Sequence, residues 1–400
     1  MKTAPLSLET LSDFDVSAER GFLPARDPLV TFSHCATLET LGRQLPKLLA
    51  SQQLRKSLKD LQVIIPTQED DWDREAYRCA NRILSFAAHG YIWEIPDQPA
   101  DYLPSNLAIP WCHVSRKLGR PPVLSYASYA LDNWRRVDPN KPIELDNIEL
   151  LQNFLGGLDE EWFVLVHVEI EAKAGPAMGA ILHAHEAAVE KDPELLKVQL
   201  ETMAAAQEAM CQTLDRMPER CDPYIYFNRV RPFIHGWKDN PALRNGLVYD
   251  GVEEFHGRPQ FFRGETGAQS SIIPVFDAAL GITHSEDPLT HFLCEMRQYM
   301  PPAHRDFLET LEHQKDEHSR PLLAGYIGEC QSKEPDLWKA YRRCVQLLAR
   351  FRGTHLDYAA SYIHQQSERR SSNATSVGTG GTPFMAYLRK HLEETKHVIE

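Results

Sequence analysis

The chain has 400 residues, of which 42% are hydrophobic and 25% charged, a composition typical of globular proteins. Its 43 basic and 56 acidic side chains give a formal net charge of −13, which argues against nucleic acid and anionic membrane surfaces as partners. No window approaches the roughly 20 apolar residues of a membrane span. The first ten residues lack the apolar core of a secretory signal, and the 8 cysteines form no Cys-x-x-Cys pair. We therefore expect a cytoplasmic protein with reduced thiols.

Helical periodicity runs through most of the chain, and strand-like alternation is scarce. Residues 97–122 are rich in proline and are expected to be irregular, while residues 366–382 read as a loop rich in Ser, Thr, Gly and Arg. The predicted fold class is all-α, with a small N-terminal helical domain over residues 1–125 and a large helical domain over residues 126–400. Helices are expected at residues 38–61, 72–88, 126–134, over most of 160–366, and at 383–396.

The most informative segment is the helix predicted for residues 334–366. Its apolar residues recur at alternating steps of four and three, which describes one buried helix face, and His355 fills the single gap in that stripe. A neutral core histidine is the commoner role for such a residue. The alternative is an axial haem ligand, held by a rigid helix in an apolar pocket. Arg352 lies close enough on the same helix to reach haem propionates, or it is a solvated surface charge.

Other cofactor chemistry finds little support in the sequence. His183 and His185 would lie on different faces of a helix, and no His-Glu-x-x-His motif occurs, so we set zinc aside. There is no phosphate-binding loop, no nucleophile elbow and no glycine-rich turn after a strand, which removes ATP, serine-hydrolase and nicotinamide chemistry. No Cys-x-x-Cys-His motif is present, so any haem would be bound non-covalently.

The chain contains Met300-Pro-Pro-Ala-His-Arg305 and Gly378-Thr-Gly-Gly-Thr382, a combination that is highly specific although neither motif is so alone. With these motifs, from about residue 20 to about residue 390, the chain resembles the indoleamine 2,3-dioxygenases. The resemblance implies an all-α fold with haem b between helices of the large domain. It also implies the insertion of both atoms of O₂ across the indole C2–C3 bond of L-tryptophan, which gives N-formylkynurenine and opens the kynurenine pathway.

The resemblance further implies roles for individual residues. His355 would be the proximal ligand of one haem b per chain, active as Fe(II), with an unidentified electron donor to reduce the ferric form. Arg231 would pair with the substrate carboxylate through its guanidinium fork. Thr379 lies in a loop that would close on the substrate's amino group, and Asp277 would lie near the haem propionates together with Arg352. The other residues expected around the substrate are Tyr126, Phe163, Tyr226, Thr266, Gly267 and Ala268.

One position departs from the mammalian-type pattern, which has a serine where this chain has His167. The related tryptophan 2,3-dioxygenases use a distal histidine that meets the indole N–H. We therefore expect His167 to act as a catalytic residue that orients the indole. A shift of two residues in the correspondence would place Leu165 at this site instead.

Three other functions stay open at this point. A haem protein of the same scaffold could carry out a different reaction on a tryptophan or indole derivative. A non-catalytic haem or tryptophan sensor is a second alternative, although Arg231 and the loop Gly378–Thr382 argue against it, since a haem sensor does not need to clamp an amino acid. The third is a helical interaction module without haem, in which His355 is a core residue.

Overall fold

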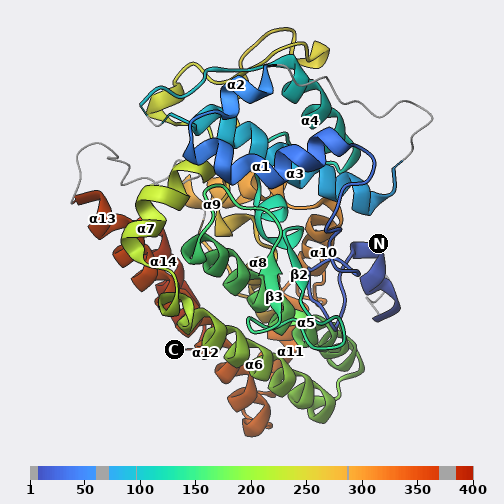
Figure 1. Ribbon diagram of the computed structural model, residues 1–400. Coiled ribbons are helices and arrows are strands. Elements are labelled where there is room, and N and C mark those ends of the chain that lie inside the picture. Colours follow the sequence, from blue (N-terminus) through green and yellow to red (C-terminus); the bar gives the residue numbers. More distant parts are fainter. Residues whose placement is uncertain (1–7, 60–71, 96, 286–287, 369–383, 400) are drawn as a thin grey trace.

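The structure, a computed structural model, describes residues 8–59, 72–95, 97–285, 288–368 and 384–399. The regular secondary structure in these ranges is almost wholly helical, which confirms the all-α prediction (Figure 1). None of the described helices is long and apolar enough to pass through a membrane. The α-helices are α1 Ala36–Ala50, α2 Leu54–Leu58, α3 Arg74–Trp93, α4 Ser105–Lys117, α5 Leu158–Glu190, α6 Pro193–Asp215, α7 Pro223–Ile225, α8 Ile272–Leu280, α9 Pro288–Met296, α10 Pro302–Glu312, α11 Leu322–Cys330, α12 Pro335–Ala359, α13 Gln365–Glu368 and α14 Phe384–His397.

The strands among the described residues are short and form two small pairs. β1 (Tyr102–Leu103) runs parallel to β4 (Val248–Tyr249), with Tyr102 opposite Val248. β2 (Trp134–Arg136) runs antiparallel to β3 (Ile148–Leu150), with Trp134 opposite Leu150. Both pairs join loops to the helical core and form no layer of their own.

The helices α1 to α4 form the upper part of the molecule in Figure 1. α3 is buried along nearly its whole length, and its first turn is capped by Asp73, whose carboxylate accepts a hydrogen bond from the Ala76 N–H at 2.8 Å. The helix predicted for residues 38–61 is two helices, α1 and α2, separated by a break at residues 51–53.

The prediction that residues 97–122 are irregular is wrong, because α4 occupies the middle of this segment. Pro104 precedes the helix in an extended conformation, and Pro110 lies inside it at the cost of one backbone hydrogen bond. Trp111 is fully buried on the face of α4 that packs against α3. Burial of this face outweighs the local preference of the prolines for irregular structure.

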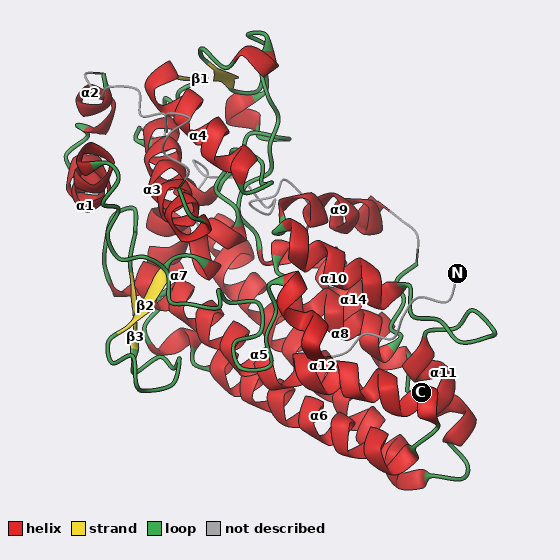
Figure 2. Ribbon diagram, turned by 90° about the vertical axis from the view of Figure 1, so that its right-hand side faces the viewer, coloured by secondary structure: helices red, strands yellow, loops and turns green. Residues whose placement is uncertain are grey.

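The rest of the molecule, from α5 to α14, is called the larger part here. Three long helices form its scaffold, with α6 packed against both α5 and α12 (Figure 2). α5 is apolar on nearly all of its faces, as expected for a buried helix. α6 begins at Asp192, which accepts a hydrogen bond from the Leu195 N–H at 2.9 Å. The helix predicted for residues 334–366 is confirmed as α12, a π-helical turn over Ala360–His364, and α13.

Residues 231–271, which we expected to be mostly helical, are mainly 3₁₀ turns and loops. Two of these loops cross so closely that a Cβ atom on Gly236 would lie 2.2 Å from the Gly264 nitrogen. Only glycine allows two backbones to approach in this way. This crossing precedes the segment that forms one wall of the cavity described below.

The two parts of the molecule share one continuous apolar core. His89 and Trp93 of α3 each hydrogen-bond to a backbone carbonyl of the larger part, at Phe233 (2.8 Å) and His235 (3.0 Å). The first described residues, which we expected in the small domain, lie against α10 of the larger part, where the Phe14 ring is 5.5 Å from Phe307.

Candidate active site

A cavity of about 330 Å³ lies between α5, α12, α14 and residues 265–277. Its walls are mostly aliphatic and aromatic, with a few polar groups that come from different elements. This arrangement is typical of small-molecule and cofactor sites. The predicted site residues that line the cavity are Tyr126, Phe163, His167, Tyr226, Thr266, Gly267, Ala268, Asp277, Arg352 and His355.

His355 lies on α12 and lines this cavity. No hydrogen bond joins its ring to any residue in the described part of the chain, so it is not a core histidine tied to a carbonyl. The surrounding protein still lowers the pKa of His355 to about 4, through burial and the nearby His167. The imidazole is therefore neutral at physiological pH, as a metal ligand must be.

His167 lies on α5, one turn after Phe163, and both face the cavity. The His167 Nδ1 atom is 2.7 Å from the Phe163 carbonyl oxygen. Because a carbonyl only accepts, Nδ1 carries the hydrogen and Nε2 carries a lone pair. Burial lowers the pKa of His167, which keeps the ring neutral. His167 thus offers a hydrogen-bond acceptor in an apolar cavity.

Two aromatic side chains, Phe163 and Tyr126, pack beside His167, and Tyr226 packs against Phe163. The Phe163 ring lies 4.7 Å from His167 and 4.6 Å from Tyr226, and the Tyr126 ring lies 6.0 Å from His167. These rings contact one another and form an aromatic surface on the cavity wall, against which a flat aromatic guest could pack. In the part of the wall formed by residues 265–277, a Cβ atom added to Gly267 would meet no atom within 4 Å, so Gly267 leaves open space.

Two buried carboxyls near the cavity were missed by the sequence reasoning. Glu171, one turn beyond His167 on α5, accepts hydrogen bonds from the Tyr126 hydroxyl at 2.8 Å and the Ser270 hydroxyl at 3.0 Å. Burial raises the pKa of Glu171 to about 7. Glu265 lines the cavity directly, and burial raises its pKa to about 8. Periodicity could not reveal either carboxyl, although an acidic residue in the apolar stretch of α5 is a visible anomaly.

A polar cluster lies at the end of the cavity that α8, α12 and α14 form. Arg352 donates hydrogen bonds to the Asp277 carboxylate at 2.6 Å and to the Thr395 hydroxyl. Asp277 also lies 3.2 Å from the Nε2 atom of His284. Arg352 and Asp277 are therefore paired with each other, at the cavity edge where the haem propionates were expected.

Arg231 does not line the cavity in this structure. It is buried, with its guanidinium carbon 5.5 Å from the centre of the Phe227 ring. Burial lowers the pKa of Arg231 to about 10, so it stays charged at neutral pH. Thr379 lies outside the described residues.

The residues present fit a haem group. The neutral imidazole of His355, which has no hydrogen bond to any residue that the structure describes, projects from a helix into a mostly apolar cavity, which is what axial ligation requires. An arginine at the polar end of the cavity, Arg352, could bind carboxylate groups.

Comparison with known proteins agrees with this geometry. The family model described as indoleamine 2,3-dioxygenase matches residues 10–398. Indoleamine 2,3-dioxygenase 2 from Homo sapiens is 35% identical over 412 residues, covering 100% of this chain and 97% of the relative. Indoleamine 2,3-dioxygenase 1 from Rattus norvegicus is 36% identical, covering 90% and 88%, and the indoleamine 2,3-dioxygenase of Saccharomyces cerevisiae is 31% identical, covering 98% and 94%. The chain is therefore a member of the indoleamine 2,3-dioxygenase family of oxidoreductases.

Proposed function

We propose that this protein binds haem b through His355 and opens the indole C2–C3 bond of L-tryptophan with O₂ to give N-formylkynurenine. The observation that carries the proposal is the neutral imidazole of His355, which has no hydrogen bond among the described residues and faces a cavity lined by His167 and aromatic rings. Iron in the Fe(II) form requires an electron donor, and the cysteine pattern favours the cytoplasm as the place of action.

When bound, ferrous haem supplies the O₂ chemistry. The chain's own residues hold and orient the substrate. Phe163, Tyr126 and Tyr226 would hold the indole by ring contacts, and the His167 Nε2 atom would accept the indole N–H and so fix its rotation. The apolar walls exclude water. Positioning of this kind can lower a barrier by about 7–11 kcal/mol in good cases.

The polar end groups of tryptophan need partners as well. We assign the carboxylate to Arg231, which lies behind Tyr226 and would reach it after a small movement of that wall. The amino group is assigned to the loop that contains Thr379. Glu265 adds a carboxyl to the wall, and a bound ammonium group would favour its ionised form.

A different indole derivative is the second candidate substrate, and Glu265 is the observation that favours it. A carboxyl with a raised pKa can donate a hydrogen bond to a polar substituent on the indole ring, or accept one from it. Comparing tryptophan with ring-hydroxylated tryptophan, in the wild type and in Glu265→Gln, would separate the two candidates. A preference for the hydroxylated substrate that disappears in the variant would favour the second.

The direct test is an absorption spectrum of the purified protein, followed by L-tryptophan and a reductant in air. We expect a Soret band and a product that has gained two oxygen atoms. His355→Ala should lose the wild-type Soret band and turnover. A product with one added oxygen would indicate another reaction on the same scaffold, and a protein without a Soret band after haem addition would exclude the proposal.

A further inference from the structure

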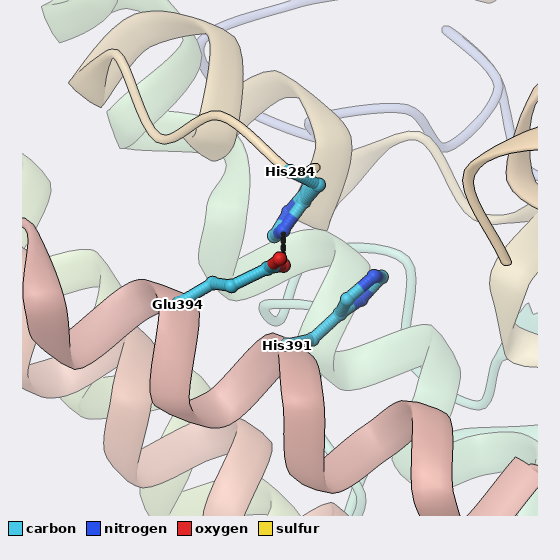
Figure 3. Close-up of side chains that lie close together, drawn as sticks. All are labelled: His284, His391 and Glu394. Atoms are coloured by element: carbon cyan, nitrogen blue, oxygen red, sulfur yellow. Dashed lines mark hydrogen bonds and ion pairs between the residues drawn. The ribbon is translucent and has the colours of Figure 1, made fainter. Parts of the chain in front are cut away.

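A cluster of two histidines and a glutamate lies where α14 meets the segment after α8 (Figure 3). His391 and Glu394 are three residues apart on α14, so their side chains share one face of the helix. His284 comes from the segment that follows α8. One donor atom from each of the three residues lies within 4.8 Å of the other two.

Two of the three side chains are hydrogen-bonded to each other, and each also has a partner outside the cluster. The His284 Nδ1–H donates to Glu394 Oε2 at 2.6 Å, while its Nε2–H donates to Asp277 at 3.2 Å. The other oxygen of Glu394, Oε1, accepts from the Ser285 hydroxyl at 2.7 Å. Metal-binding histidines and carboxylates are oriented by outer partners of this kind.

The third side chain has an unused nitrogen. The His391 ring stacks on His284 with centroids 4.1 Å apart, and its Nε2 atom is buried without a hydrogen-bond partner among the described residues. Buried polar atoms of native proteins nearly always have a partner. A cation between the three side chains would supply one.

We propose that His284, His391 and Glu394 bind a divalent transition-metal ion of the zinc class, separate from the haem iron. Two imidazoles and one carboxylate are a ligand set that zinc uses, with a fourth position left for water. Imidazole nitrogen disfavours Mg²⁺ and Ca²⁺, which select oxygen ligands. On binding, the ion would replace the proton that His284 Nδ1 donates to Glu394, and this proton would pass to solvent.

The ion would join α14 to the segment that follows α8. α14 also packs along α12, which carries His355, through the Arg352–Thr395 contact. In the sequence, α14 follows directly after the Gly378–Thr382 motif. The site would therefore hold in place the helix that follows this motif and borders the cavity through Leu388 and His391.

The test uses the full-length, haem-loaded protein after treatment with a chelator. Titration calorimetry with ZnCl₂ should show one site per chain, and zinc should raise the melting temperature. Glu394→Gln and His391→Ala should each weaken zinc binding at least tenfold. Ser285→Ala, which removes an outer hydrogen bond, should weaken it about 10- to 100-fold.

The sequence offers a matched control. His183 and Glu186 have the same spacing on α5 and lie 3.1 Å apart, but no third ligand joins them in the described part of the chain. His183→Ala should leave zinc binding unchanged. The Soret spectrum and haem content, measured for every variant, separate this site from the haem site.

Four results would overturn the proposal. They are the absence of zinc binding, zinc binding that survives both Glu394→Gln and His391→Ala, competition by Mg²⁺ or Ca²⁺ at equal concentration, and loss of haem from these variants with zinc binding intact. The last result would assign the cluster to the haem propionates.

Discussion

The position of one hydrogen atom decides what His167 can do in the cavity. Its Nδ1–H is used by the Phe163 carbonyl in the turn before it, so only the acceptor nitrogen Nε2 is left for a ligand. A serine at this position, as in the mammalian-type pattern, could donate as well as accept. We therefore expect His167 to favour a guest that carries an N–H.

We expect this chain to discriminate against 1-methyltryptophan, which lacks the indole N–H. A buried acceptor without a donor costs about 1–3 kcal/mol, so the methylated substrate should bind or turn over correspondingly worse than tryptophan. His167→Ser should narrow the difference and retain part of the activity. The measurement is kcat/KM for both substrates in both proteins, and equal discrimination in the two would remove His167 from substrate recognition.

Arg231 is charged and buried, but it does not line the cavity, so its role in binding the substrate carboxylate needs a separate test. If it receives the substrate carboxylate, Arg231→Ala should weaken tryptophan binding by about 2–5 kcal/mol. Tryptamine, which has no carboxylate, should bind to Arg231→Ala almost as tightly as it binds to the wild type. Dissociation constants from Soret titrations give both values.

The control for this experiment is Arg229→Ala, because Arg229 is exposed only two residues away. Arg229→Ala should leave the dissociation constants of both tryptophan and tryptamine unchanged. An equal loss of affinity for tryptophan and tryptamine in Arg231→Ala would mean that Arg231 supports the cavity wall and does not read the carboxylate.

At the scale of a single element, α5 combines substrate contacts with a buried carboxyl. His167 faces the cavity, while Glu171 one turn later faces Tyr126 and Ser270. Glu171 thus ties two residues of the cavity wall to the helix that carries His167. Burial raises the pKa of Glu171 to about 7 from a usual value of 4.5, although both hydrogen bonds that it accepts favour the ionised form.

The expected pH dependence follows from linkage. Between about pH 4.5 and 7 the folded chain holds the Glu171 proton and the unfolded chain does not, so the free energy of unfolding falls as pH rises through this window. The loss from this one group is up to about 3 kcal/mol. Glu171→Gln should remove this pH-dependent loss. The free energy of unfolding of the variant, relative to the wild type, should therefore be higher at pH 8 than at pH 5.

Urea unfolding at the two pH values measures this difference. The exposed Glu201 of α6 provides a control, because Glu201→Gln should shift stability equally at both. A difference between Glu171→Gln and the wild type that stays constant from pH 5 to pH 8 would contradict the assignment.

At the scale of the whole molecule, the cavity lies in the larger part, but side chains of α3 stabilise this larger part through hydrogen bonds. His89 accepts the Leu124 N–H at 2.9 Å and donates to the Phe233 carbonyl, and Trp93 donates to the His235 carbonyl. We therefore expect a fragment of residues 126–400 to lack cooperative unfolding and a stable Soret band. Removing α3 would leave buried carbonyls unpaired and apolar core exposed.

Circular dichroism and haem titration of the fragment check this prediction. Co-expression with residues 1–125 is the control, and it should restore haem binding if the two pieces assemble. A fragment that melts cooperatively and binds haem alone would show that the larger part is an independent domain.

Local patterns in the sequence were enough to predict the helical class and the long helix that carries His355. Its stripe of apolar residues depends only on near neighbours, and α12 follows it closely. The proline-rich segment shows the limit of such reasoning. Residues 97–122 were expected to be irregular on local grounds, but packing of α4 against α3 decided the outcome.

The polar contacts of the site could not be predicted from the sequence, because they join residues that are far apart along the chain. Tyr126 and Glu171 are 45 positions apart, and His284 and Glu394 are 110 apart. The spacing His-x-x-Glu occurs at His183, at His391 and at His397, so this spacing by itself does not single out His391. Only the tertiary structure brings a third ligand to the second of them, because packing of distant segments determines which side chains meet.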